Sequence, residues 1–324
     1  AAAAAAEDAA RRAEPDLPDA LSTQVVVDAP GEEPSAPVPI AEVVATIRAE
    51  KPAVVFAPHV ETAAGLMLPD DYLKAVADAA HEVGGLFVLD CIASGALWVD
   101  MKATGVDVVI SAPQKGWTGS PCCAFVMLGE RARTAIDSTT SNSFALDLRK
   151  WLQIMETYES GAHMYHTTMP TDALTRTRDV MLETKALGFE KLRAAQLELG
   201  RKVRATLVRR GFPSVAAEGF QAAGVVVSYT TDDGLQSGKS FLAEGLQSAS
   251  GVPLQCDEGP DFKTFRLGLF GLRGLLSLVD AAIPGGADRR GRRSRAAGDF
   301  IGDSVDHLQR TLQPHRHVGQ RHNP

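Results

Sequence analysis

Short apolar runs alternate with amphipathic stretches along the chain after residue 39. Four of these runs predict buried strands, at residues 54–56, 86–89, 106–110 and 124–128. Helical spacing predicts one helix from residue 40 to Lys51-Pro52 and another over residues 70–83, which Gly84-Gly85 closes. Apolar runs that alternate with helices favour a mainly parallel sheet covered by helices on both faces, and therefore an α/β fold.

The second half of the chain has a different pattern. Residues 147–210 are predicted to be helical almost throughout, with a break at residues 161–170 and a bend at Gly188, and so long a helix could link two domains. Apolar runs at 225–227 and 265–270, with a helix around 241–246, indicate a smaller α+β domain.

The ends of the chain lack this periodicity. The first residues are rich in Ala, Pro and acidic side chains, and the last are rich in Arg, His and Gly, so both ends are expected to be solvated. The pattern predicts five segments: a disordered or loosely attached segment 1–38, the core of a large domain 39–170, linking helices 171–210, a small α+β domain 211–280, and a disordered basic tail 281–324.

Composition and charge narrow the class of function. The chain has 324 residues, 45% of them hydrophobic, which is enough for a substantial core. Its net charge of −7 provides no basic field for nucleic acid or an anionic membrane, and no apolar run is long enough to span a bilayer. Its four cysteines lack zinc-site spacing, so we expect no metal site and reduced thiols in a cytoplasmic protein. Small-molecule chemistry is the favoured class.

Two polar residues follow neighbouring predicted strands. Asp90 ends the second apolar run, and Lys115 follows the third after a short connection. Taken singly, Lys115 is typical of a surface lysine and Asp90 of a strand-end cap. Because α/β folds bind their ligands at the carboxyl edge of the sheet, we expect the amine and the carboxylate to meet in one crevice. Pyridoxal 5′-phosphate (PLP) needs such a pair: an amine for its aldehyde and a carboxylate beside its pyridine nitrogen.

Five separated segments resemble the class V aminotransferases, which are PLP enzymes of fold type I and include alanine–glyoxylate and serine–pyruvate aminotransferases. The segments are His-Val-Glu-Thr-Ala-Ala-Gly at 59–65, Leu-Asp-Cys-Ile-Ala-Ser at 89–94, Ser-Ala-Pro-Gln-Lys at 111–115, Tyr-His-Thr-Thr-Met-Pro at 165–170 and Phe-Arg-Leu-Gly at 265–268. The resemblance covers roughly residues 38–280. It implies PLP as the cofactor, bound by residues 39–170.

The resemblance also implies a role for each matched residue. Lys115 would form the Schiff base with PLP and then move a proton as general base and acid. Arg266 would grip the substrate carboxylate, and Tyr165 with Thr168 would bind the PLP phosphate in the neighbouring subunit, which implies a homodimer with shared sites. The remaining implied cofactor contacts are Asp90 at the pyridine nitrogen, Ile92 on the ring, Gln114 at the phosphate and Thr62. His59 could be structural or catalytic.

The chain departs from this family at three places. Residues 1–50 contain neither the Gly-rich loop that cradles the phosphate at a helix N-terminus nor the aromatic residue that stacks on the ring. Cys122 stands where glycine is usual, and the tail after Val279 cannot form the expected closing helix. The altered start and end together suggest a truncated or mis-translated reading frame.

Several functions therefore remain open. The leading interpretation is transamination between alanine or serine and glyoxylate or pyruvate. An alternative is transamination of 2-aminoethylphosphonate, because Arg266 could grip either anion. A cysteine desulfurase is a minor option, with Cys256 as its only candidate thiol near Arg266. A remnant that holds no cofactor is the alternative outside the enzymes.

Overall fold

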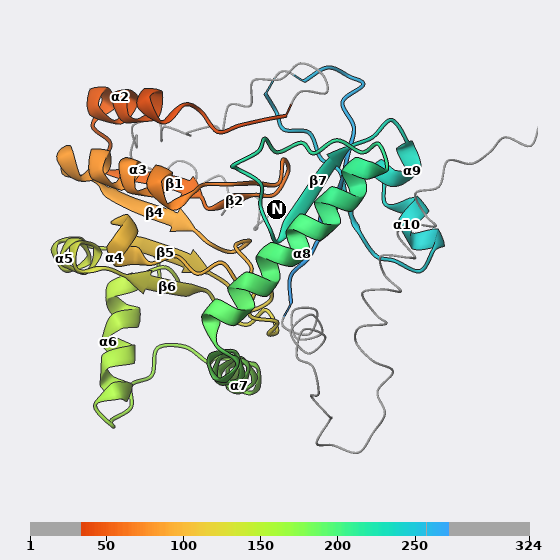
Figure 1. Cartoon of the computed structure of the whole chain (residues 1–324). Helices are drawn as coiled ribbons and strands as arrows, with labels where there is room; N and C mark the ends of the chain where they lie inside the picture. The colour runs from red at the N-terminus through yellow and green to blue at the C-terminus, as the bar shows by residue number, and fades with distance from the viewer. Residues whose placement is uncertain (1–33, 257, 272–324) are drawn as a thin grey trace, which may run out of the picture.

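Two sheets and a long helix organise the protein. The computed structural model describes residues 34–256 and 258–271, so the predictions for residues 1–33 and for the tail lie outside the described residues. Helix α8 (Phe189–Arg209) runs from the larger sheet to the smaller one (Figure 1). No helix in the described ranges is both long and apolar enough to cross a membrane.

The larger sheet contains all four strands that the apolar runs predict. They are β1 (Val54–Pro58), β4 (Leu86–Asp90), β5 (Val108–Ser111) and β6 (Phe125–Leu128), and they lie in the order β1-β4-β5-β6. The pairs β1·β4 and β4·β5 are parallel, whereas β6 is antiparallel to β5. No helix crosses the sheet between β5 and β6, so the chain returns from the edge where β5 ended. The sheet is therefore mainly parallel, as predicted, with one reversed edge strand.

Helices cover both faces of this sheet. On one face lie α2 (Ile40–Glu50) and α3 (Asp70–Glu82), whose Leu73 is fully buried with Phe87 and Leu89 of β4. On the other face, α5 (Glu130–Ser138) packs Ala132 against β4 and β5.

Strand β1 is covered on one face only. Val54 and Phe56 are 40% and 61% exposed on the face opposite α3, although both are apolar. Within the described residues β1 pairs only with β4, so the other edge of β1 carries unpaired backbone groups. This edge of the sheet is an incompletely covered part of the core.

The smaller sheet is antiparallel. It contains β7 (Val225–Tyr229), β9 (Thr264–Gly268) and β8 (Ala249–Ser250) in the order β7-β9-β8. The short helices α9 (Asp233–Gln236) and α10 (Lys239–Ala243) pack beside it, with Phe241 and Phe265 fully buried in the shared core. This arrangement is the α+β unit that the sequence predicts.

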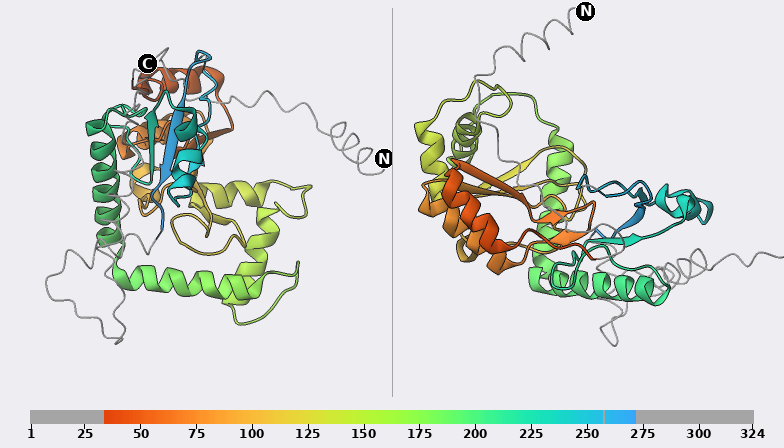
Figure 2. Two further views of the ribbon diagram at one scale, coloured as in Figure 1. Left: turned by 90° about the vertical axis from the view of Figure 1, so that its right-hand side faces the viewer. Right: turned by 90° about the horizontal axis from the view of Figure 1, so that it is seen from above.

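Three helices connect the sheets. They are α6 (Leu148–Glu159), α7 (Thr171–Leu187) and α8. The predicted bend at Gly188 separates α7 and α8, which run in different directions in Figures 1 and 2, and its φ of 96° is a conformation that favours glycine. Fully buried Gln196 of α8 donates to the carbonyls of Ala223 and Leu269, so α8 is fixed to the end of the smaller sheet where β7 begins and β9 ends. The exact domain boundaries stay a prediction.

Candidate active site

The carboxyl ends of β1, β4 and β5 meet at one edge of the larger sheet. Pro58, Asp90 and Ile110 are aligned across the three strands, so the segments that follow them leave the sheet side by side. The first of these segments forms the hairpin of β2 (Val60–Glu61) and β3 (Leu66–Met67), whose turn contains Thr62. The structure therefore brings Thr62, the Asp90 segment and the Lys115 segment to one edge.

Asp90 presents an exposed carboxylate at this edge. One of its oxygens accepts a hydrogen bond from the backbone N–H of Ile92 at 2.8 Å, which turns the chain directly after β4 and orients the side chain. Ile92 itself is half-buried. An exposed carboxylate that holds only a local turn is free to pair with a ligand cation.

Lys115 presents its amine beside the segment that follows Asp90. The Lys115 side chain is exposed, and its backbone carbonyl accepts from the N–H of Thr118 at 3.0 Å. At Gly116 a β-carbon would lie 2.3 Å from the backbone oxygen of Gly95, so only glycine fits. This close approach fixes the Lys115 segment against the Asp90 segment.

A ring that sequence reasoning missed lies below the lysine amine. The Nζ of Lys115 lies 6.0 Å from the centroid of Phe270, at the outer limit of a cation–π contact. A β-carbon at Gly224 would lie 2.8 Å from the Phe270 ring, so glycine makes room for it. Phe270 follows Arg266 by four positions, and an aromatic residue so near a substrate-binding candidate is the signal that could have identified it.

The turn that carries Thr62 is held by its own acidic residue. The Glu61 carboxylate accepts from the backbone N–H groups of Ala63 and Ala64 at 2.7 and 2.6 Å. The hairpin is also tied to the segment before β7, because the N–H of Ala222 donates to the carbonyl of Gly65. Thr62 is half-buried in this turn, and Gln114, directly before Lys115, is exposed.

His59 joins two segments below the site. Its backbone N–H donates to the carbonyl of Asp90 at 2.9 Å, and its Nδ1 lies 2.7 Å from the hydroxyl oxygen of Ser94. The side chain is only 4% exposed, and this burial lowers the pKa of His59 to about 4, although the negative charge of Asp70 opposes the shift. His59 is therefore neutral at physiological pH, and Ser94 is a partner that the sequence did not assign.

The cysteines nearest the site are poor nucleophiles or lie in the core. Burial raises the pKa of Cys91 to about 12, so its sulfur stays protonated at neutral pH. Cys256 packs partly buried against the cluster that includes Val60 and Val225, and its N–H donates to Glu258.

Three predicted residues lie on other elements. Tyr165 is 76% exposed in the loop between α6 and α7, and its hydroxyl lies 3.3 Å from that of Thr168. Arg266 lies on β9 and donates from Nε to the carbonyl of Ser250 at 2.8 Å. No polar contact recorded among residues 34–256 and 258–271 joins any of the three to Asp90 or Lys115, so their roles stay predictions.

The side chains at this edge carry functional groups that match those of PLP. Asp90 matches a pyridinium nitrogen, Lys115 an aldehyde and Thr62 a phenolic oxygen, and all three follow parallel strands of one sheet. The phosphate is less well provided for, because Gln114 is the only predicted phosphate contact at this edge of the described structure. The cofactor's reactive end therefore fits this edge better than its phosphate does.

Comparisons with known proteins show what the chain as a whole is similar to. No family model matches the chain. Its curated relatives include 2-aminoethylphosphonate–pyruvate transaminases from Paraburkholderia phymatum, 28% identical over 230 residues, and from Burkholderia mallei, 30% identical over 237 residues. Each match covers 69% of this chain but only 58% and 60% of the respective relative. The chain thus spans about three fifths of the length of the curated relatives it matches.

Solved structures of the same fold include aminotransferases. Alanine–glyoxylate aminotransferase from Nostoc sp. superposes with a TM-score of 0.66 at 19% identity, covering 88% of this chain and 66% of that one. Pyridoxamine–pyruvate aminotransferase from Mesorhizobium loti gives a TM-score of 0.62 at 19% identity, with 82% and 69% covered. The predicted fold type I and the resemblance to class V aminotransferases are confirmed.

Proposed function

We propose that this chain, whose relatives and structural neighbours include aminotransferases, carries out PLP-dependent transamination. The observation that carries this proposal is the convergence of Asp90 and Lys115 at one sheet edge, where the contact of Gly116 with Gly95 holds their segments together. Relatives that are named transaminases support the reaction class.

Each residue would do one task in this reaction. PLP, when bound, supplies an electron sink for the carbanion at the substrate Cα. The Nζ of Lys115 would hold the cofactor through its aldehyde carbon and, once displaced, would carry a proton between the substrate Cα and the cofactor C4′. Asp90 would keep the ring nitrogen protonated. Ile92 would pack on the ring, Thr62 would donate to its phenolic oxygen, and Gln114 would bind the phosphate.

The substrates that this site supports best are a small amine donor and pyruvate or glyoxylate as the acceptor. Alanine or serine is the leading donor, and Arg266 would bind its carboxylate through a planar bidentate contact. The curated relatives favour 2-aminoethylphosphonate as the second candidate donor. Transamination rates measured with each donor under the same conditions distinguish the two candidates. The assay is needed because Arg266 could bind either a carboxylate or a phosphonate.

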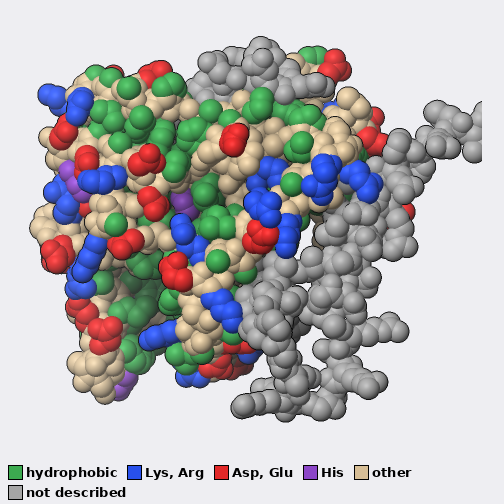
Figure 3. All heavy atoms as spheres, in the orientation of Figure 1, with side chains coloured by type: hydrophobic (Ala, Val, Ile, Leu, Met, Phe, Trp, Pro, Cys, Tyr) green, Lys and Arg blue, Asp and Glu red, His purple; other side chains and the backbone are tan. Residues whose placement is uncertain are grey.

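A homodimer with shared sites completes the proposal. Five large apolar or aromatic side chains are exposed between 57% and 76% on α6 and its flanking loops: Phe144, Leu146, Met155, Tyr158 and Tyr165. Figure 3 shows hydrophobic side chains exposed beside α6 and below β6. Exposed apolar surface of this kind is typical of a protein interface. In such a dimer, Tyr165 and Thr168 would reach the phosphate in the partner's site.

The proposed compartment is the cytoplasm. All four cysteines are free thiols in the structure, including the adjacent pair Cys122 and Cys123. Thiols of this kind persist where the surroundings are reducing.

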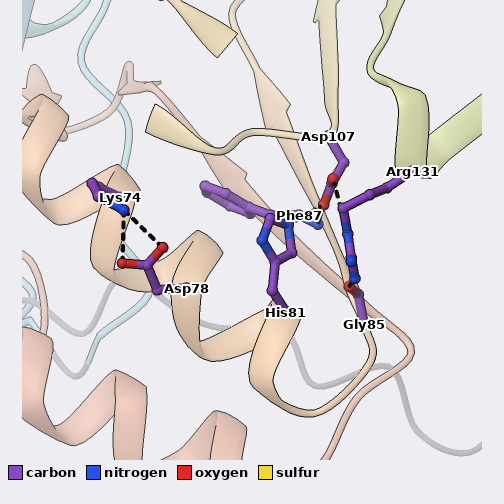
Figure 4. Close-up of polar contacts among 7 residues, drawn as sticks. All are labelled: Lys74, Asp78, His81, Gly85, Phe87, Asp107 and Arg131. Carbon is purple, nitrogen blue, oxygen red and sulfur yellow. Dashed lines mark hydrogen bonds and ion pairs between the residues drawn. The ribbon is translucent and has the colours of Figure 1, made fainter. Parts of the chain in front are cut away.

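Borohydride trapping tests the proposed function. We expect the protein mixed with PLP and reduced with borohydride to carry the cofactor on Lys115, which blocks trypsin there and yields one peptide of residues 103–131 instead of two. Lys115→Ala should carry no label in this region. Lys74→Ala is the matched control, because Lys74 is exposed and paired with Asp78 on α3 (Figure 4).

Two outcomes would contradict the proposal. Labelling spread evenly over exposed lysines, unchanged in Lys115→Ala, would show that PLP reacts without a site. A complete lack of labelling would show that the chain holds no cofactor and would favour a remnant without activity.

A further inference from the structure

Cys122 and Cys123 place two sulfur atoms side by side at the end of the Lys115 segment. Their Sγ atoms are 3.8 Å apart, and both side chains are partly buried. Adjacent side chains of an extended strand point to opposite faces, so this contact requires a turned backbone. The chain has no regular secondary structure between the bend at Pro121 and the start of β6 at Phe125.

The two sulfurs have different neighbours. Burial raises the pKa of Cys123 to about 11, and the neighbouring Cys122 acts in the same direction. The Sγ of Cys122 lies 3.6 Å from the hydroxyl oxygen of Thr177 on α7. The Thr177 hydroxyl already donates to the carbonyl of Ala173, so its oxygen is available as an acceptor for the Cys122 thiol.

We propose that Cys122 and Cys123 are a reversible oxidation site, which hydrogen peroxide converts into a disulfide between adjacent residues. The Cys122 sulfur attacks one peroxide oxygen, the O–O bond breaks, one water leaves and a sulfenic acid remains. The Cys123 sulfur then attacks the Cys122 sulfur, the S–S bond forms, and the S–O bond breaks to release a second water. Two thiols are oxidised while one peroxide is reduced to two waters.

The geometry predicts that this disulfide is easily reduced. Consecutive Cα atoms lie about 3.8 Å apart, whereas ordinary disulfides join Cα atoms separated by about 4.4–6.8 Å. A bond that closes so short a span is strained, and strained disulfides are the ones that thiols reduce readily. The pair therefore suits a reversible modification better than a permanent crosslink.

Oxidation of the pair would act on the segment that positions Lys115. The Gly119 N–H donates to the carbonyl of Pro113 at 2.7 Å, and a β-carbon on Gly119 would lie 3.1 Å from the same Thr177 hydroxyl that Cys122 contacts. Thr177 therefore supports both the lysine turn and the cysteine pair. Movement of Cys122 toward Cys123 would loosen this support, and this consequence rests on the proposed function.

Peptide mass analysis without PLP tests the oxidation site independently of that function. Trypsin releases residues 116–131, which contain both cysteines but neither Cys91 nor Cys256. After peroxide treatment and alkylation of remaining thiols, we expect this peptide to be lighter by two hydrogen atoms and to carry no alkyl group. Reduction before alkylation should restore a peptide alkylated at both cysteines.

Variants distinguish the pair from the other thiols. The double variant Cys91→Ser, Cys256→Ser should form the same oxidised peptide, whereas Cys122→Ser and Cys123→Ser should instead gain oxygen atoms at the remaining cysteine. The proposal is overturned if wild-type peptide 116–131 only gains oxygen, stays fully alkylated, or is linked to a second chain on a non-reducing gel. A second assay compares the visible absorbance of the PLP-loaded protein before and after oxidation, with no borohydride present. No change there would overturn only the effect on the lysine turn.

Discussion

The two ends of β4 and β5 use their acidic residues in opposite ways. At the amino end, Asp107 is 4% exposed, and its carboxylate accepts from the N–H of Phe87 at 2.8 Å and lies 2.8 Å from Nε2 of His81. Arg131 approaches the same carboxylate at 3.5 Å and also donates to the carbonyl of Gly85 (Figure 4). At the carboxyl end, Asp90 is exposed and holds only a local turn.

This difference separates a buried, paired carboxylate from an accessible one within one sheet. The Asp107 carboxylate contacts groups on α3, β4 and α5 and is buried, so a ligand cannot reach it. Asp90 leaves most of its capacity free, which is what a binding residue requires. A carboxylate at a strand end is thus informative only together with its burial and its partners.

The largest expected effect tests the amino end. Asp107→Ala should lower the free energy of unfolding by about 3–5 kcal/mol, because it leaves the Phe87 N–H and the His81 side chain without their buried partner. Asp90→Ala should lower it by less than about 1 kcal/mol, since only one exposed turn bond is lost. Urea unfolding measures both. Equal losses in the two variants would remove the contrast between the two ends.

The next effect concerns the buried histidine at the carboxyl end. His59 has a folded-state pKa of about 4, below the usual unfolded value of about 6.5, so the unfolded chain takes up a proton first as the pH falls. The contribution of His59 to the free energy of unfolding is therefore fully present above about pH 6.5. Between that pH and about pH 4 the free energy of unfolding falls by about 3 kcal/mol.

The variant His59→Gln isolates this titration. Glutamine can still hydrogen-bond Ser94 but does not titrate, so the difference in unfolding free energy between wild type and variant should shrink between pH 7 and pH 4. Urea unfolding at several pH values measures it. A difference that does not depend on pH would mean that His59 is not buried in its neutral form.

The smallest expected effect concerns Arg131, which contacts Asp107 at the amino end of the strands. Arg131→Ala should lower the free energy of unfolding by less than about 1 kcal/mol, because the Arg131 side chain is 47% exposed and its contact with Asp107 is long. Thermal unfolding in low and high salt is the measurement. A loss as large as that of Asp107→Ala would mean that the ion pair, rather than the bond to Phe87, carries the stability.

The strands, and the position of the Asp90 and Lys115 segments at one sheet edge, could be predicted from sequence because their signals are local. Each strand of the larger sheet coincides with a predicted apolar run; Asp90 ends one of them, and Lys115 follows another after a short connection. The reversed direction of β6 could not be predicted, since it depends on how residues 112–124 return across the sheet edge.

Pairings between distant residues were also missed. His59 and Ser94 are 35 positions apart and meet only because β1 and β4 align in register. Asp107 lies inside the apolar run 106–110, where an acidic residue is itself a sign of a buried partner that the sequence analysis did not use. The roles of Tyr165 and Arg266 come from the resemblance, because neither residue follows a strand of the larger sheet.

The edge of β1 that has no partner strand in the described structure limits which polypeptides can pair with it. A strand that pairs with β1 must supply unpaired N–H and carbonyl groups in register with Val54–Pro58, and an apolar side chain that covers Phe56. Without such a strand, the same edge is a template for unwanted association at high concentration. A lysine in place of Phe56 would add a charge to this strand and disfavour its pairing with the same strand of another copy.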